Sequence, residues 1–304
     1  MPLHVAPCSR REFLVRGSAA VASLAVLRNS FAAEQHDANS FALLADTHIP
    51  ERPDVEARDV NMTANLKQVV AQLRGLDPKP AGVIINGDCA YLKGLAADYA
   101  NLAQCIAPLA DADLPLHLTM GNHDDRGPFY DALAAQRPAD PPVESKHVSV
   151  IQTPQANLFL LDSLREVNVV TGELGQQQLS WLARALDEHS EKPAIVIAHH
   201  NPQFEAPPEG TPWGGLMDSA AFFELLSAKK QVKAYVFGHT HNWSLSQRDG
   251  IHLINLPPVA YVFGAGKPNG WVHARMQPDG IDLQLMTLDA LHPQAGQLVH
   301  LTWR

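Results

Sequence analysis

The chain has 304 residues, of which 46% are hydrophobic and 18% are charged, and its formal net charge at pH 7 is −9. This length and composition suit one large domain with a sizeable hydrophobic core. No basic run follows the first residues. This argues against a general nucleic-acid binder and against docking on an anionic membrane, because both require a positively charged face.

The first 33 residues resemble a twin-arginine export signal. Paired arginines within Ser9–Gly17 precede a short apolar run, Ser18–Leu27, and then small residues suited to cleavage near Ala32 or Ala33. The run is too short and too rich in alanine and serine to predict a membrane span. The resemblance implies the twin-arginine (Tat) export machinery as a partner, a periplasmic or otherwise exported location, and no stable membrane span in the mature chain. The alternative is an amphipathic first helix with two arginines by accident.

Residues 34–304 are expected to form a single domain of 271 residues. The removed segment carries four arginines and one glutamate, so the net charge of the mature chain becomes −12. Cys8 is lost with the signal, and the remaining Cys89 and Cys105 cannot make a disulfide framework. A single bridge between them and two buried free thiols are both compatible with the sequence.

Apolar runs alternate with segments of helical periodicity along the mature chain. Runs of four to six residues rich in Val, Ile, Leu and Phe predict buried strands, and their alternation with helices predicts an α/β domain. An alternating tail over 271–287 predicts the last strands of the same domain. The predicted strands are 41–45, 82–86, 116–120, 194–198 and 234–237, and the predicted helices are 62–73, 95–109, 127–136, 174–189 and 218–229.

Each of the five strands is followed by a short polar motif. Functional residues of open α/β sheets collect beyond the carboxyl ends of the strands, so these motifs are expected to share one site. If the paired residues at two-residue spacing stay extended, their side chains point to the same side, and the glycines permit close approach or sharp turns. Each motif alone is also explained as a surface loop, a turn or a strand-end hydrogen-bonded pair. The motifs are Asp46-Thr47-His48, Gly87-Asp88, Gly121-Asn122-His123-Asp124, His199-His200 and Gly238-His239-Thr240-His241.

In this order, D-x-H, G-D, G-N-H-D, H-H-x-P and G-H-x-H resemble the motifs of the calcineurin-like metallophosphoesterase family. The resemblance implies a four-layer α/β/β/α sandwich of two mixed sheets, with two metal ions at the carboxyl ends of the strands. It implies that His123 meets the leaving-group oxygen or a phosphate oxygen, and that Asp124 orients His123. The implied ligands are Asp46, His48, Asp88 and His241 for one metal, and Asp88, Asn122, His199 and His239 for the other, with Asp88 bridging.

The residue types agree with this chemistry. Imidazole, carboxylate and amide ligands without thiolates suit two divalent or mixed-valence ions of Fe, Mn or Zn. Only Asp46 and Asp88 are anionic among the proposed ligands, so the site stays positive enough to receive a phosphate group. The predicted function is hydrolysis of a small phosphomonoester or phosphodiester by a metal-bridging hydroxide. The alternatives are a non-catalytic binding protein of the same fold and a metallohydrolase that acts on a non-phosphate substrate.

Two ligand assignments have competing interpretations. Alignment of His-His-Asn-Pro with the family's usual His-His-Pro-Pro favours His199 as ligand and leaves His200 at the pocket rim or behind the ligands. Asp88-Cys89-Ala90-Tyr91 also resembles the G-D-x-x-Y motif of purple acid phosphatases, in which the tyrosine binds ferric iron. That subgroup lacks the histidine of D-x-H, so we predict that His48 is a ligand and that Tyr91 is a packing residue.

Substrate selection is expected from two loops rich in proline and glycine, residues 201–215 and 262–271. Within the second loop, Lys267 and Trp271 either contact the substrate or belong to a turn. Asp162 either supports the metal ligands from behind or is a strand-end turn residue. Arg126 either contacts the phosphate or is a solvated arginine at a helix start.

Overall fold

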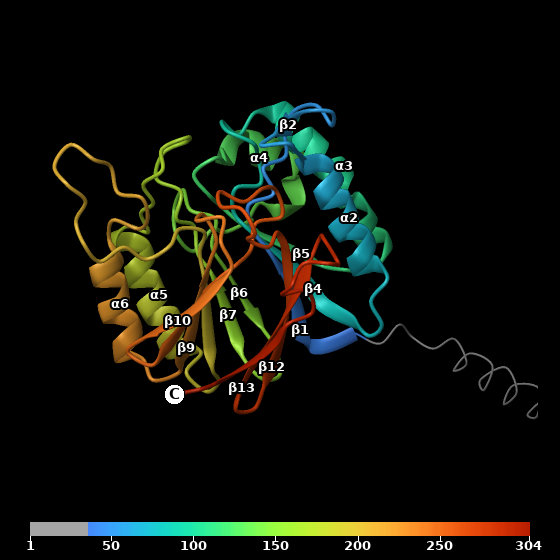
Figure 1. Cartoon of the computed structure of the whole chain (residues 1–304). Coiled ribbons are helices and arrows are strands. Elements are labelled where there is room, and N and C mark those ends of the chain that lie inside the picture. Colours follow the sequence, from blue (N-terminus) through green and yellow to red (C-terminus); the bar gives the residue numbers. More distant parts are fainter. Residues whose placement is uncertain (1–35) are drawn as a thin grey trace, which may run out of the picture. The chain divides into compact units, whose positions relative to one another are not determined.

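The computed structural model describes residues 36–304. Two six-stranded mixed sheets pack face to face, and helices cover the outer face of each (Figure 1). The predicted four-layer α/β/β/α sandwich is therefore confirmed. The predicted signal segment, residues 1–33, lies outside the described residues. Within the described part, no helix has the length and apolar character needed to cross a membrane.

The first sheet combines parallel and antiparallel neighbours. Its β1 and β4 pair in parallel, as do β4 and β5, whereas the other neighbouring strands pair antiparallel. In spatial order the strands are β14 (Leu298–Thr302), β13 (Gly280–Thr287), β12 (Gly270–Gln277), β1 (His36–Leu44), β4 (Lys79–Asn86) and β5 (Leu116–Thr119).

The second sheet has a parallel centre between antiparallel edges. Three successive parallel pairings join β11, β9, β8 and β7, and an antiparallel strand closes each edge. In spatial order the strands are β10 (Ser244–Arg248), β11 (Ile251–Asn255), β9 (Val232–Phe237), β8 (Ala194–Ile197), β7 (Asn157–Leu160) and β6 (Ser149–Gln152). A separate hairpin is formed by β2 (Glu56–Ala57) and β3 (Val60–Asn61).

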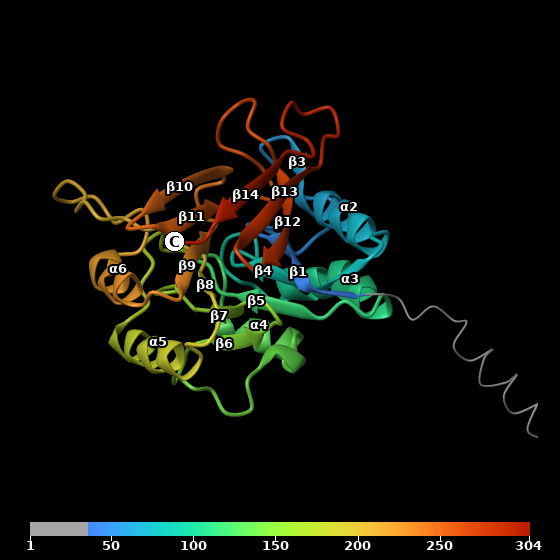
Figure 2. The same cartoon turned by 90° about the horizontal axis from the view of Figure 1, so that it is seen from below.

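The helices divide between the two outer faces. Figure 2 shows α2 and α3 beside the first sheet and α5 and α6 beside the second. The Asn61 side chain caps α2 by accepting a hydrogen bond from the Ala64 backbone at 2.8 Å, which satisfies one of the free N–H groups at a helix start. The helices are α2 (Met62–Arg74), α3 (Ala96–Asp111), α4 (Arg126–Ala132), the 3-10 turn Ala134–Gln136, α5 (Gln176–Glu188) and α6 (Ser219–Ala228).

The central strands are buried on both faces, as their unbroken apolar runs predicted. In β1, Phe41 and Leu43 pack into the core between the two sheets, whereas Ala42 and Leu44 pack toward α2 and α3. A third core lies between the second sheet and α5 and α6. The sheets are therefore held from both sides, which fixes the positions of their strand ends.

Most predicted elements are present with ends shifted by a few residues. The predicted helix 127–136 is wrong as one element, because the chain leaves the helical conformation at Leu133 and resumes as a 3-10 turn. The predicted tail strands are β12 and β13, but the two sheets contain five strands that were not among those predicted: β6, β7, β10, β11 and β14. For β14, the alternating sequence LVHLT was the signal that could have revealed it.

Candidate metal centre

The five polar motifs meet where the two sheets end side by side. They follow β1, β4 and β5 of the first sheet and β8 and β9 of the second. Backbone hydrogen bonds join these segments, with the Asp46 N–H donating to Gly87 and the Gly238 N–H donating to His199. The Asp46 carboxylate also accepts the His239 N–H, at 3.1 and 3.2 Å, and so links the two sheets. The convergence predicted from the strand ends is thus found in the fold.

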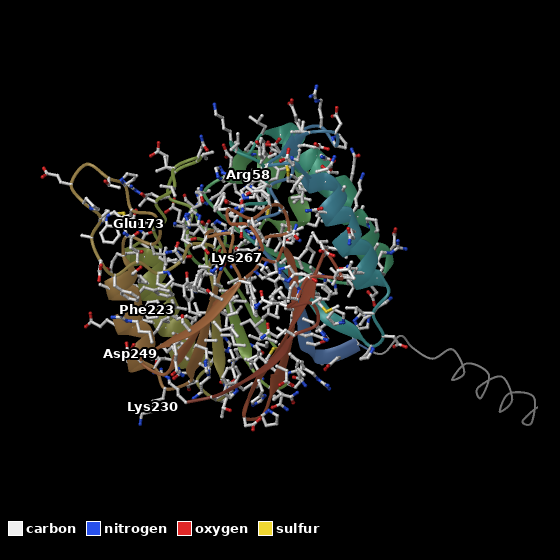
Figure 3. All side chains as sticks on the ribbon, viewed as in Figure 1. Arg58, Glu173, Phe223, Lys230, Asp249 and Lys267 are labelled. Carbon is white, nitrogen blue, oxygen red and sulfur yellow. The ribbon has the colours of Figure 1, made fainter. Side chains whose placement is uncertain are left out.

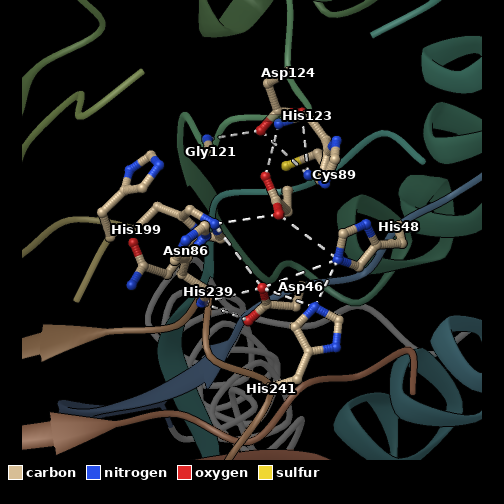
Figure 4. Close-up of polar contacts among 12 residues, drawn as sticks. Asp46, His48, Asn86, Cys89, Gly121, His123, Asp124, His199, His239 and His241 are labelled. Carbon is tan, nitrogen blue, oxygen red and sulfur yellow. Dashed lines mark hydrogen bonds and ion pairs between the residues drawn. The ribbon is translucent and has the colours of Figure 1, made fainter. Parts of the chain in front are cut away.

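The side chains of these motifs form overlapping groups with the spacing of metal ligands (Figure 4). In each group, the candidate ligand atoms lie within 4.8 Å of one another. His48 Nε2 and His241 Nε2 approach to 2.9 Å, and Asp46 Oδ1 lies 3.5 Å from His241 Nε2. The groups are Asp46, His48 and His241; Asp88, His199 and His239; and His48, Asp88 and His123.

Asp88 lies between the two principal groups. Its Oδ2 is 3.6 Å from His48 Nε2 and 3.2 Å from His199 Nε2, so one carboxylate oxygen faces ligands of both proposed metals. Its Oδ1 accepts the backbone N–H of His123 at 2.9 Å, which holds the carboxylate in this orientation. A carboxylate in this position suits a bridge between two ions about 3.5–4 Å apart.

Four candidate ligand histidines each have one ring nitrogen held by a backbone carbonyl. Nδ1 of His48 contacts the Tyr91 carbonyl at 3.1 Å, and Nδ1 of His199 contacts that of Asn86 at 2.9 Å. Such contacts fix the tautomer and leave the other nitrogen for a metal. In His239 the contact uses Nε2, which leaves Nδ1. The remaining partners are the Tyr261 carbonyl for His241 and the Gly214 carbonyl for His239.

Two buried polar atoms test whether a metal fits this site. Among the described residues, His199 Nε2 and Asn122 Oδ1 are buried without a hydrogen-bond partner. Leaving such atoms unpaired is costly, and although His199 Nε2 has Asp88 Oδ2 3.2 Å away, Asn122 Oδ1 has no partner in the described chain. An amide oxygen and a neutral imidazole nitrogen are both lone-pair donors of the kind that bind Fe, Mn or Zn. The donor set therefore fits the two predicted ions.

Five of the seven proposed ligands have a left-handed backbone. The extended conformation considered for D-x-H and H-x-H is therefore not observed, although the paired side chains still converge. Non-glycine residues rarely adopt positive φ, and such strain persists where the surrounding structure enforces it. The φ values are 54° for Asp46, 45° for His48, 49° for Asp88, 66° for His239 and 50° for His241.

The motif glycines are required for close approach. A Cβ on Gly121 would lie 2.2 Å from Asp88 Oδ1, and a Cβ on Gly238 would lie 2.6 Å from Asp46 Oδ2. Both distances are impossible contacts, so each glycine leaves room for a carboxylate of the site. This confirms the close backbone approach predicted for these positions.

The predicted orientation of His123 by Asp124 is corrected by the structure. The Asp124 carboxylate accepts backbone N–H groups of Cys89, Ala90 and Gly121 and the Tyr99 hydroxyl, all between 2.9 and 3.2 Å. The His123 ring is instead held by the Leu92 carbonyl, 2.8 Å from Nδ1. Asp124 therefore braces the loops that carry Asp88 and His123, because its oxygens are occupied by their backbones.

Charge interactions within the cluster favour an ionised Asp88. Burial opposes ionisation, but His199, His123 and His48 together hold the pKa of Asp88 well below its ordinary value, with His199 contributing most. Burial also lowers the pKa of His48 and of His239 to about 3, which keeps both rings neutral. Burial opposes protonation of His199, but Asp88 and Asp46 raise the pKa of its ring to about 9. A bound metal would displace this proton, because metal ligation requires a neutral imidazole.

The fold separates the residues whose ligand assignments compete. His199 lies in the ligand cluster, whereas His200 is buried behind it with Nδ1 2.7 Å from the Ser163 hydroxyl. Tyr91 packs against the apolar core beside α2 and α3. Cys89 and Cys105 are buried free thiols. Burial raises the pKa of the Cys89 thiol well above its usual range, so it stays protonated.

The partly exposed Arg126 forms an ion pair with the buried Asp162, a role that was not among those considered from the sequence. Arg126 donates from Nε and Nη2 to the Asp162 carboxylate, both at 2.7 Å, and Nη2 also reaches the Leu164 carbonyl. The Asp162 side chain is fully buried and accepts the His147 and Leu164 backbones as well. The pair ties the start of α4, directly after the His123 motif, to the end of β7.

Replacing Arg126 with alanine is expected to lower the free energy of unfolding by about 2 kcal/mol, because it leaves the Asp162 charge buried without its partner. This value allows for the partial exposure of the arginine. Urea denaturation measures the free energy of unfolding. Arg126→Lys should lose an intermediate amount, because an ammonium group cannot make the bidentate contact. The control is Arg165→Ala, whose 3.7 Å pair with Glu173 is exposed. Equal losses in both alanine variants would contradict a special role for the buried pair.

The loops around the cluster contain residues that sequence reasoning missed. Trp271 was a candidate substrate contact, but it is fully buried and donates from Nε1 to Gln72 at 2.8 Å, so it is a core residue. Lys267 lies on the exposed part of its loop. The rings beside the ligands are instead Tyr261 and Phe263, which contact the rings of candidate metal ligands. Aromatic residues in a loop carry no spacing signal, which is why they were missed.

The sequence was compared with known families and proteins. The profile of the family described as calcineurin-like phosphoesterase matches residues 40–243. A 3',5'-cyclic adenosine monophosphate phosphodiesterase CpdA from Pseudomonas aeruginosa is 27% identical, over 78% of this chain and 85% of that protein. A glycerophosphodiester phosphodiesterase GpdQ from Enterobacter lignolyticus is also 27% identical, over 72% of this chain and 77% of its own length.

Solved structures show the same fold at lower sequence identity. A dimetal phosphatase from Danio rerio superimposes with a TM-score of 0.67 at 17% identity, over 87% of this chain and 99% of that one. A purple acid phosphatase from yellow lupin gives a TM-score of 0.58 at 16% identity, over 86% of this chain and 52% of the lupin chain. At these identities, the similarity concerns the fold alone.

Proposed function

Because this chain belongs to the calcineurin-like phosphoesterase family and is a metal-dependent phosphoesterase, we propose that it hydrolyses phosphodiesters in preference to phosphomonoesters. The observation that carries the phosphoesterase chemistry is the position of Asp88 between two ligand groups. The diester preference is supported by two similar proteins, which are named as a cyclic-nucleotide and a glycerophosphodiester phosphodiesterase.

The proposed ligands fall into two sets, one for each metal ion. When bound, two divalent ions would supply a hydroxide nucleophile at neutral pH and offset the charge of the phosphate. Asp46, His48, Asp88 and His241 would hold one ion, and Asp88, Asn122, His199 and His239 would hold the other. Fe, Mn and Zn all suit these nitrogen and oxygen donors.

His123 is proposed to act on the leaving group. Its Nδ1 contacts the Leu92 carbonyl, which directs the opposite ring edge toward the cluster that it shares with His48 and Asp88. A histidine in this position can donate a proton to the departing ester oxygen. Asp124 is proposed to support this step indirectly, by bracing the backbone beside Asp88 and His123.

The location is also a proposal. The paired arginines, apolar run and small residues of positions 1–33 support export through the twin-arginine machinery to the periplasm. That machinery exports folded cargo, so the enzyme would load its metals in the cytoplasm and meet its substrate outside it.

Metal analysis combined with two ester assays tests this function. We expect about two metal ions per chain, and release of p-nitrophenol from bis-p-nitrophenyl phosphate faster than from p-nitrophenyl phosphate. Chelation should abolish both activities, and added Mn²⁺, Zn²⁺ or Fe²⁺ should restore them. A preference for the monoester would overturn the diester proposal, and full activity after verified metal removal would overturn the metal mechanism.

A further inference from the structure

Two aromatic rings line the mouth of the metal centre. Phe263 stacks on the His241 ring with centroids 4.3 Å apart and planes at 21°, and Tyr261 stacks on His48 at 5.4 Å and 21°. Both belong to the loop between β11 and β12, and the Tyr261 carbonyl also contacts His241 Nδ1. The loop that fixes a candidate ligand therefore also places aromatic surface directly beside it.

Phe263 presents much of its ring to solvent. It is 57% exposed, although it lies against a buried candidate ligand. Exposed apolar surface is unfavourable in water, and where it adjoins a functional centre it commonly marks a ligand contact. Tyr261 lies 6.1 Å from Phe263 between ring centroids with the ring planes at 54°, so the two rings adjoin at an angle beside the candidate ligands.

Arg58 completes this surface from a different segment. Its guanidinium carbon lies 4.9 Å from the Phe263 centroid and 5.7 Å from the Tyr261 centroid. Figure 3 shows Arg58 at the end of the molecule where the loops beyond the strands gather. Arg58 makes no ion pair with any other residue of the described chain, so its charge remains available to a ligand.

The backbone at Arg58 is strained. Arg58 and Asp59 form the two-residue turn of the β2–β3 hairpin, and their φ values are 54° and 63°. A turn with positive φ at both central positions favours Asn and Gly, so an arginine here is unfavourable for the turn itself. Strain of this kind at a site mouth supports a functional role for the side chain.

We propose that Arg58, Tyr261 and Phe263 form a platform for a nucleobase, so that the preferred substrates are nucleotide diesters and not glycerophosphodiesters. This inference rests on the proposed diesterase function. A base has a flat π face that stacks on aromatic rings and on a guanidinium plane, whereas glycerol has no such face. The platform touches candidate ligands of the first metal, so a base there lies within one nucleotide of a phosphate at the metals.

The test compares two diesters in Phe263→Ala. We expect the ratio of kcat/KM for 3',5'-cyclic AMP to that for glycerophosphoethanolamine to fall about tenfold, mainly through KM, as loss of a stacked base predicts. Phe263→Tyr should restore the ratio because it restores a ring. The control is Leu298→Ala, an exposed apolar residue on β14 that should leave the ratio unchanged. Metal content is measured in every variant.

The outcomes separate the platform from the function on which it rests. An unchanged ratio in Phe263→Ala would overturn the platform, whether or not the two activities fall. If both activities fall equally, Phe263 only supports His241. A wild-type enzyme that prefers the glycerophosphodiester would overturn the platform and leave the diesterase function intact. A metal-loaded enzyme that cleaves no diester, bis-p-nitrophenyl phosphate included, would overturn the diesterase function itself.

Arg58→Asn provides a second, independent test of the platform. Asparagine suits positive φ, so the melting temperature should hold or rise while the substrate ratio falls. A stable variant with an unchanged ratio would remove Arg58 from the platform.

Discussion

Replacement of Asp88 with asparagine is expected to empty at least one metal position and to reduce phosphodiester hydrolysis by more than about a thousandfold. Asp88 Oδ2 faces His48 and His199, which belong to opposite halves of the proposed pair. An amide keeps the shape but removes one of only two anionic ligands, so two cations would face each other with less charge between them.

The measurement is metal content by elemental analysis, together with kcat/KM for bis-p-nitrophenyl phosphate. Asp187→Asn is the matched control, because Asp187 is an exposed carboxylate on α5 that pairs with Lys229. That variant should bind two metals and keep its activity. Two fully retained metals with near-normal turnover in Asp88→Asn would rule out Asp88 as the bridge.

The ligand positions were predictable because strand ends bring distant residues together. Short apolar runs identify the strands, and parallel strands bring their carboxyl ends to one edge of a sheet. Asp46 and Asp88 could therefore be grouped at the end of one sheet, and His199, His239 and His241 at the end of the other. The packing of the two sheets brings both groups together. The order of the motifs therefore predicts which residues belong to the metal centre.

The details that depend on hydrogen-bond competition were not predictable. Asp124 is next to His123 in sequence, yet its oxygens accept backbone groups of the neighbouring loops. The left-handed φ values of Asp46 and Asp88 likewise arise from the surrounding packing and have no local signal such as glycine. The platform was missed for a related reason, since Arg58 and Phe263 come from unrelated loops that meet only in the fold.

Replacement of His123 with alanine is expected to reduce turnover by about a hundredfold to ten thousandfold while both metals remain bound. The Asp88 carboxylate is held by the backbone N–H of His123, which alanine retains, so the bridge should stay in place. The substitution removes the ring, which contacts the Leu92 carbonyl and the neighbouring His48 ring. The loss should therefore fall on the chemical step and leave metal content unchanged.

Leaving-group dependence distinguishes the role of His123 as a proton donor from a purely electrostatic one. p-Nitrophenolate is a good leaving group and departs without a proton. The alkoxide of a sugar or an alkyl ester is a poor leaving group and must be protonated as it departs. His123→Ala should therefore harm an alkyl diester much more than bis-p-nitrophenyl phosphate, whereas loss of a positive charge near the phosphate would slow both to a similar extent. Equal losses on the two esters would refute proton donation, and unchanged turnover would remove His123 from the mechanism. The unequal loss is expected because the ring lies in the cluster that also contains His48 and Asp88, where the proposed proton donor would be close to a phosphate ester bound at the metals.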